Sequence, residues 1–222
     1  MDIERNIVEL ETRINRVAER ANRSPDEITI VAVSKGVDTT AIKKALEAGI
    51  SNIGENRVKE ARGKVEELSS LGLRPTWHMV GHLQTNKVKT ALGLFDIIHS
   101  IDSLRLAQAL SRSTEKTVLV LLEVNLSGEE TKNGFSASEV SKAVEGLAPL
   151  PNLEIKGLMT VAPTVDDPEE VRPVFRRLRE LGDSLGLKEL SMGMTDDFEV
   201  AVEEGATMVR IGRAIFGERN RR

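Results

Sequence analysis

A lysine stands directly after one of the most apolar runs of the chain. Residues 28–36 read ITIVAVSKG, in which aliphatic residues stop at Ser34, Lys35 and Gly36. Such a run predicts a strand buried on both faces of a parallel sheet. Ligands of α/β proteins bind at the carboxyl ends of such strands, where an amine among apolar walls can act as a nucleophile. Lys35 is therefore a candidate for covalent chemistry; the alternative is the first solvated residue after a core strand.

Two loops near the other end of the chain could bind an anion. Residues 191–197 (SMGMTDD) and 209–217 (VRIGRAIFG) each read as a strand end, a glycine and the start of a helix. Gly193 and Gly212 let backbone N–H groups approach an anion closely, and Ser191 and Thr195 add hydroxyl groups. Because barrels commonly bind phosphate after strands seven and eight, the two loops predict a phosphate site. The alternative is two helix caps with turn glycines.

The elements that must position these residues alternate along the chain. Apolar residues every three or four positions predict a first helix, ended near Ser24 and Pro25. Strand and helix then alternate eight times, which predicts an α/β (β/α)8 TIM barrel with an additional N-terminal helix, as one domain over residues 1–222. An open doubly wound sheet is the alternative. The expected strands are 28–36, 50–55, 76–81, 95–101, 118–125, 153–160, 189–192 and 207–211; the longest later helices are 58–71, 86–94, 137–147, 167–185 and 196–204.

Closure of the barrel would make the first and eighth strands neighbours. The amine of Lys35 would then lie beside the phosphate site of Ser191 and Gly212. A phosphorylated aldehyde needs this pair of groups, and pyridoxal 5′-phosphate fits the description.

Composition limits the other functions. The net charge is −4 and the isoelectric point about 5.6, so we expect neither a nucleic-acid partner nor a membrane partner. The chain has no cysteine and no tyrosine, and the lack of cysteine excludes disulfides and thiolate catalysis.

The N-terminus lacks an apolar signal segment, so a cytoplasmic location is expected. The three histidines have no metal-ligand spacing, so no metal is predicted. His78 reads as a general base or a packed strand residue, and His82 and His99 as surface or loop residues.

Several segments together carry a family resemblance. In chain order they are VAVSK (31–35), GENRVKEA (54–61), WHMVGHLQTNK (77–87), HSIDS (99–103), VNLSGEETKNG (124–134), GLMT (157–160), SMGMTDDFEVAVEEG (191–205) and VRIGRAIFG (209–217). The sequence closely resembles the pyridoxal 5′-phosphate homeostasis proteins, a single-domain branch of the alanine racemase-like, fold type III barrels.

The resemblance implies a role for each site residue. Lys35 would carry pyridoxal 5′-phosphate as a covalent aldimine, and Asn56 would lie near the 3′-oxygen of the cofactor. Arg210 would face the pyridine nitrogen. The phosphate would be held by Ser191, Gly212 and Arg213; Lys132 is a further candidate for ligand contact. Gly36 and Val37 depart from the turn expected after the lysine, and Arg213 stands where many relatives carry threonine, so only its backbone N–H would serve.

Three functions follow from these residues. The first is a non-catalytic carrier that buffers vitamin B6, with apoenzymes as recipients and no catalytic residues. The second is an amino-acid racemase or decarboxylase on the same barrel. Such enzymes place a tyrosine or cysteine opposite the lysine, supplied by the second domain of a partner subunit, and only His78 could replace it here. The third is a class I aldolase using Lys35. We expect the carrier, as a monomer, because this chain lacks the second acid/base and the second domain.

Overall fold

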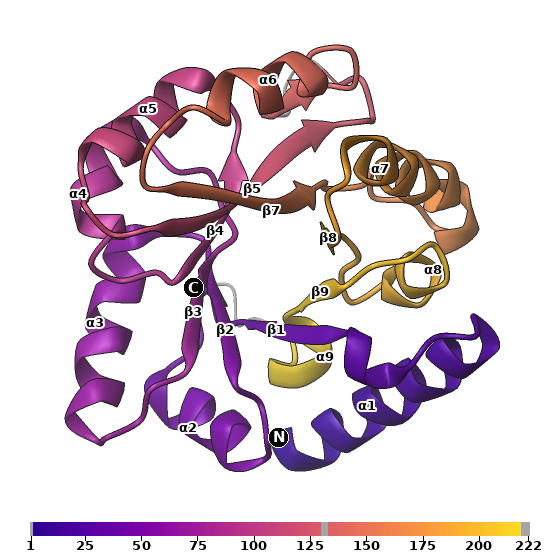
Figure 1. Cartoon of the computed structure of the whole chain (residues 1–222). Helices are drawn as coiled ribbons and strands as arrows, with labels where there is room; N and C mark the ends of the chain where they lie inside the picture. The colour runs from indigo at the N-terminus through magenta and orange to yellow at the C-terminus, as the bar shows by residue number, and fades with distance from the viewer. Residues whose placement is uncertain (1, 130–132, 219–222) are drawn as a thin grey trace.

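Eight parallel strands close into a barrel in the computed structural model, which describes residues 2–129 and 133–218. Each strand pairs with the next along the ring, and the pairings of β4 with β5 and of β9 with β1 complete it (Figure 1). The predicted (β/α)8 barrel is confirmed. The barrel strands are β1 (Thr29–Val33), β2 (Asn52–Glu55), β3 (Thr76–Met79), β4 (Ile97–Ile101), β5 (Val118–Asn125), β7 (Leu153–Met159), β8 (Glu189–Ser191) and β9 (Met208–Ile211).

Helices form the outer ring, as parallel strands require for their crossover connections (Figure 1). No helix among the described residues is both long and apolar enough to cross a membrane. The helices are α1 (Ile3–Arg20), α2 (Thr39–Glu47), α3 (Val58–Ser70), α4 (Val88–Ala91), α5 (Leu104–Arg112), α6 (Val140–Leu147), α7 (Arg172–Leu185), α8 (Phe198–Glu203) and α9 (Arg213–Phe216).

The additional N-terminal helix completes this ring. Its apolar stripe is buried, and α1 packs against α8, α9 and α2. The Asn6 side chain donates to the Ile215 carbonyl at 2.9 Å, and Arg13 pairs with Glu199 at 2.8 Å. Since α9 is a single turn, α1 occupies the part of the ring that a longer eighth helix would cover (Figure 1).

Three local expectations differ from the structure. The expected helix 167–185 is a 3₁₀ turn (Pro168–Val171) followed by α7, because Pro173 has no N–H to donate to the preceding turn. The expected helix 86–94 is a 3₁₀ turn (Thr85–Lys87) followed by the short α4. A two-residue strand, β6 (Phe135–Ser136), pairs with the end of β5 outside the barrel.

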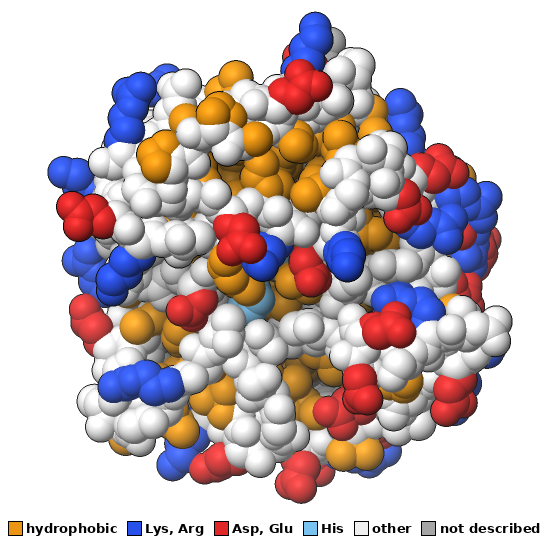
Figure 2. Space-filling view, viewed as in Figure 1, with side chains coloured by type: hydrophobic (Ala, Val, Ile, Leu, Met, Phe, Trp, Pro, Cys, Tyr) orange, Lys and Arg blue, Asp and Glu red, His pale blue; other side chains and the backbone are white. Residues whose placement is uncertain are grey.

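The interior is mostly apolar, but it includes buried polar side chains, one group of which lies inside the barrel. Charged side chains of both signs surround the face seen in Figure 2, with hydrophobic side chains visible between them. Inside the barrel, His78, His99, Ser191 and Arg210 are each at most 5% exposed. Buried polar groups need partners, so these residues must bond to one another or to the backbone.

Candidate active site

A cavity of about 300 Å³ lies at the carboxyl ends of β1, β2, β8 and β9. It contains five of the six predicted site residues, Lys35, Asn56, Arg210, Gly212 and Arg213; Ser191 does not line it. We call it the rim cavity. Its other lining residues are Val33, Val80, Val161, Met194, Thr195 and Asp196.

The turn that carries Lys35 is held on both sides. Ser34 is fully buried, and its hydroxyl donates to Glu55 Oε1 at 2.5 Å. Lys64 Nζ donates to the Ser34 carbonyl at 2.6 Å, and the Gly36 N–H donates to Glu60. The backbone before and after Lys35 is therefore fixed by a network that does not use the lysine's own amine.

Lys64 is the centre of that network. Its ammonium is buried and lies 2.6 Å from Glu55 Oε1 and 2.8 Å from Glu60 Oε1. Burial raises the pKa of Glu55, although hydrogen bonds from Lys64 and Ser34 act against it. Burial also disfavours the charge of Glu60, but the hydrogen bonds from Lys64 and Gly36 prevail and lower its pKa. The sequence hinted at this pair through the spacing of four residues between Glu60 and Lys64 on one helix.

Asn56 lines the rim cavity, and its side-chain oxygen lacks a hydrogen-bond donor among the described residues. Its Oδ1 is buried and has no hydrogen-bond partner within the described part of the chain. A buried amide oxygen in this state can accept a hydrogen bond when a ligand with a donor arrives. The residue is seated against Gly81, where a Cβ would come within 2.5 Å of the Asn56 carbonyl oxygen, so only glycine fits there.

The predicted anion-binding loops meet in the rim cavity. Gly212 precedes α9, and the Ala214 N–H points to Thr195 Oγ1 at 3.4 Å. Thr195 lines the cavity, whereas sequence analysis named it only as a supporting hydroxyl. The Arg213 guanidinium pairs with Asp196 and Glu218, so its backbone is what remains for an anion. Gly193 has φ +90°, and a Cβ there would lie 2.5 Å from Ala201 Cβ.

Arg210 is fixed by three hydrogen bonds, two to Ser191 at the end of β8 and one to Thr160, which follows β7. Nη1 donates to Ser191 O and Oγ, both at 2.7 Å, and Nη2 donates to Thr160 O at 2.7 Å. Burial lowers the pKa of Arg210 to about 10, while nearby Asp197 and Glu123 favour its charged form. The guanidinium therefore stays protonated at neutral pH.

Behind Arg210 runs a chain of hydrogen bonds. Ser191 Oγ lies 2.8 Å from His99 Nδ1, His99 Nε2 lies 2.9 Å from His78 Nδ1, and His78 Nε2 lies 3.0 Å from Asn52 Oδ1. Burial lowers the pKa of His78 to about 4 and that of His99 well below its usual value, so both rings are neutral. A neutral ring has one donor and one acceptor. Each bond then has a single direction, from Arg210 through Ser191, His99 and His78 to the Asn52 oxygen.

These hydrogen bonds correct the expectation for His99 and decide between the two alternatives for His78. His99 is fully buried on β4, so its expected place on the surface or in a loop is wrong. A polar residue in the middle of an apolar strand was the signal that could have shown it. His78 is the packed strand residue of the two alternatives. His82 is half exposed, as expected, and its Nδ1 lies 3.0 Å from Asp102 Oδ2.

Lys132 lies outside the described residues. Among the described residues, no group of three or more histidines and carboxylates is arranged to hold a metal ion.

Comparisons with known proteins agree with this architecture. Residues 6–220 match the family described as "Alanine racemase, N-terminal domain". A pyridoxal phosphate homeostasis protein of Aquifex aeolicus is 45% identical over 216 residues, which cover 93% of this chain and 94% of the relative.

Two solved structures show the same fold at appreciable identity. A protein described as unknown from Bifidobacterium adolescentis has a TM-score of 0.90 at 36% identity, covering 97% of this chain and 94% of the other. PipY of Synechococcus elongatus PCC7942, solved with PLP bound, has a TM-score of 0.80 at 36% identity, covering 92% of this chain and 100% of PipY. The chain therefore belongs to the family of pyridoxal phosphate homeostasis proteins.

Proposed function

We propose that this protein binds pyridoxal 5′-phosphate in the rim cavity, holds it covalently through Lys35, and stores and releases it without turning over a substrate. The observation that carries the proposal is that one cavity contains Lys35, Asn56, Arg210 and the Gly212 loop. The related protein PipY was solved with the same ligand bound. The cofactor would supply an aldehyde and an electron-accepting ring.

The residues present fit the separate parts of that ligand. Lys35 offers the amine for the aldehyde. The Gly212 loop and Thr195 offer N–H and hydroxyl donors for the phosphate, and the unsatisfied Asn56 Oδ1 can accept from the ring hydroxyl. Ser191 acts on the ligand through Arg210, which it orients by two hydrogen bonds.

Arg210 supports a holding role over catalysis. A guanidinium that remains charged can donate a hydrogen bond to the ring nitrogen but cannot accept a proton from it. The ring nitrogen then stays unprotonated, which makes the ring a weaker electron sink. Extensive carbanion chemistry is disfavoured in such a site.

The racemase alternative needs a second acid/base. The chain has no tyrosine and no cysteine. His78, the one replacement considered, is 1% exposed, does not line the rim cavity and uses both ring nitrogens in hydrogen bonds. These contacts favour the non-catalytic role. The aldolase alternative would use the same lysine and anion loops for a sugar phosphate, and the related PipY, solved with PLP bound, favours the carrier over it.

The remaining parts of the proposal rest on the sequence. They are a single domain over residues 1–222, a monomer in the cytoplasm, and apoenzymes as recipients of the cofactor. Light scattering on the eluted protein tests the oligomeric state.

The experiment that tests the function combines binding and turnover. Purified protein incubated with pyridoxal 5′-phosphate and desalted should keep the visible absorbance of a lysine-bound cofactor, and Lys35→Ala should lose it. Lys188→Ala, a change at an exposed lysine ahead of β8, is the matched control and should behave as the wild type. The loaded protein should then produce no D-isomer from a panel of L-amino acids. Sustained racemisation would overturn the non-catalytic role.

A further inference from the structure

A second cavity, of about 460 Å³, adjoins the rim cavity. The two share Lys35 and Asn56, which form part of the wall of each. The second cavity extends from there over the start of α3, the end of β3 and the 3₁₀ turn Thr85–Lys87. We call it the basic pocket and define it by Lys35, Asn56, Arg57, Lys59, His82 and Lys87.

The charge of the basic pocket is the reverse of that of the whole chain. The chain carries 35 acidic and 31 basic residues, for a net charge of −4. Four lining residues, Lys35, Arg57, Lys59 and Lys87, are cations, and no aspartate or glutamate lines the pocket. Within the part of the chain that the structure describes, no carboxylate lies within ion-pair distance of these four. Several cations without an ion-pair partner around one cavity favour an anionic ligand.

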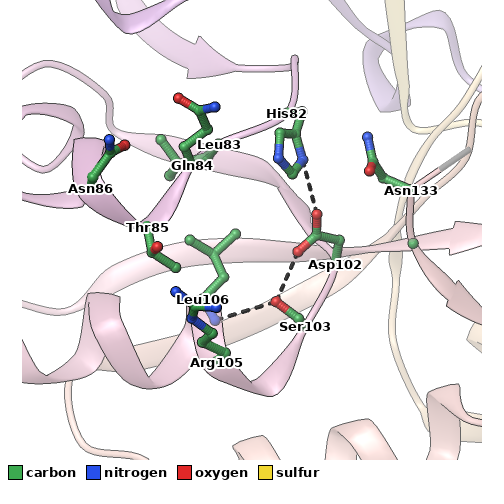
Figure 3. A pocket seen from close by; sticks show the side chains of 11 residues that line it. His82, Leu83, Gln84, Thr85, Asn86, Asp102, Ser103, Arg105, Leu106 and Asn133 are labelled. Carbon is green, nitrogen blue, oxygen red and sulfur yellow. Dashed lines mark hydrogen bonds and ion pairs between the residues drawn. The ribbon is translucent and has the colours of Figure 1, made fainter.

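The nearest carboxylates are already engaged. Glu60 accepts from Lys64 and from the Gly36 N–H. Asp102 accepts from Ser103 at 2.9 Å and contacts His82 at 3.0 Å, as Figure 3 shows. His82 lines both the basic pocket and the cavity drawn in Figure 3, whereas Asp102 lines only the latter. Glu60 offsets part of the charge of Arg57, but its carboxylate is bonded to Lys64 and Gly36, and neither acid lines the basic pocket.

Backbone geometry at the start of α3 adds donors to these cations. The N-cap residue of α3 is Arg57, and its side chain makes no capping hydrogen bond. At the same position of α1 and α2, Asp2 and Asp38 accept from the helix backbone. An arginine at this position leaves the first N–H groups for an acceptor from outside, and an anion in the basic pocket would be that acceptor.

We propose that the basic pocket is a second anion site, which binds the phosphate group of a small phosphorylated compound beside Lys35. The proposal goes beyond the binding of pyridoxal 5′-phosphate, whose phosphate is assigned to the Gly212 loop in the other cavity. A dianion suits the pocket better than a carboxylate does, because Arg57, Lys59 and Lys87 remain as cations from two elements when Lys35 carries the cofactor. Free phosphate and a phosphate monoester share this chemistry, and the test separates them.

The test uses protein whose rim cavity is already filled. The protein is loaded with pyridoxal 5′-phosphate, reduced with borohydride and checked by mass, so that the first phosphate site is permanently occupied. Inorganic phosphate is then titrated calorimetrically, and glycerol phosphate in a parallel titration. We expect one phosphate to bind per chain. Its affinity should fall when the sodium chloride concentration is increased by a factor of about ten. Equal or tighter binding of glycerol phosphate would assign the pocket to monoesters.

Variants locate the second site. Lys59 and Lys87 are exposed and line only the basic pocket, so the double change Lys59→Gln and Lys87→Gln should leave the fold and cofactor attachment intact. It should weaken phosphate binding about tenfold, because each exposed charge contributes modestly. The control combines Lys142→Gln with Lys188→Gln, which removes the same two charges at exposed residues that line neither cavity.

Three outcomes decide the question. No phosphate binding to the reduced protein, or equal affinity in the double variant and the control, would overturn the second site. If borohydride adds no mass, the proposed cofactor role fails instead. In that case the same variants titrated with unreduced protein still test the basic pocket, since selective loss of binding in the double variant supports it and equal binding overturns it.

Discussion

Arg210 Nη1 lies 2.7 Å from Ser191 Oγ, and this contact joins the rim cavity to a buried chain of neutral histidines. Ser191 accepts from the arginine, so its own proton can only be donated to His99. The direction of every later bond follows. The orientation of the guanidinium at the cavity is thus supported from β8, β4, β3 and β2, far beyond the residues that line it.

Two substitutions of His99 separate the bonds of this chain. In His99→Asn the amide oxygen can take the place of Nδ1 and still accept from Ser191. In His99→Gln the amide nitrogen can take the place of Nε2 and still donate to His78, but the acceptor for Ser191 is lost. We expect His99→Gln to release pyridoxal 5′-phosphate about tenfold faster than His99→Asn, since one lost buried hydrogen bond costs about 1–3 kcal/mol.

Stopped-flow transfer of cofactor to an excess of an apoenzyme measures the release rates. Both variants lose one bond of the chain, so each serves as the stability control for the other. Equal release rates at equal thermal stability would contradict a role for Ser191 in orienting Arg210.

The buried histidines predict a pH dependence of stability. The pKa of His78 is about 4 in the folded protein, against 6.5 for an unperturbed histidine, because burial disfavours the charged ring. Between these values the unfolded chain binds a proton that the folded one does not. The free energy of unfolding therefore falls as the pH drops from about 6.5 to about 4, by at most about 3 kcal/mol for this residue. His99 acts in the same direction.

Denaturant titrations at pH 7 and pH 5 measure this effect. The variant His78→Asn keeps an acceptor for His99 but cannot be protonated. Its stability should change less between the two pH values than that of the wild type. If the change in stability between pH 7 and pH 5 is the same in His78→Asn and in the wild type, His78 does not take up a proton on unfolding.

The buried ammonium of Lys64 predicts a large loss of stability on its removal. Lys64→Met would leave two carboxylates, Glu55 and Glu60, without their shared cation. Breaking a buried ion pair in this way costs about 3–5 kcal/mol. The turn around Lys35 would also lose the bond to the Ser34 carbonyl, so covalent attachment of the cofactor should slow. Lys64→Arg, which keeps the charge, is the control, and similar denaturation midpoints for the two variants would count against the network.

A glycine beside the site and a glycine within α3 predict opposite effects of added methyl groups. In Gly81→Ala the new Cβ would lie 2.5 Å from the Asn56 carbonyl oxygen and 2.7 Å from its Cα. Backbone must then move, at a cost of about 1–3 kcal/mol, and Asn56 shifts within the rim cavity. In Gly63→Ala, within α3, the Cβ meets nothing within 4 Å, and a gain of about 0.5–1 kcal/mol is expected. Thermal unfolding of both variants checks the signs.

The strand ends were predictable because parallel barrels place them at one face. The register of β1 against β9, which pairs Val31 with Arg210, brings the Lys35 turn and the Gly212 loop together as the sequence predicted. Short apolar runs and glycines carried that information.

The interior of the barrel was not predictable in the same way. Ser191 ends its strand like the ligand-binding residues, yet it is fully buried and bonded to His99. Which polar side chains meet inside depends on the stagger of strands far apart in the sequence, as between β4 and β8. A single sequence also does not show which lysines or arginines, such as Lys64, form ion pairs in the core.

The most direct test of the central claim is peptide mapping by mass spectrometry after borohydride reduction of the loaded protein. The account predicts a single modified peptide, with the cofactor mass on Lys35. In the Thr195→Val and Gly212→Val proteins, treated at a limiting cofactor concentration, this modification should be lost. Modification of a different lysine would contradict a shared cavity for the amine and the anion site. Equal modification of Lys35 in the wild type and in both phosphate-loop variants would contradict it as well.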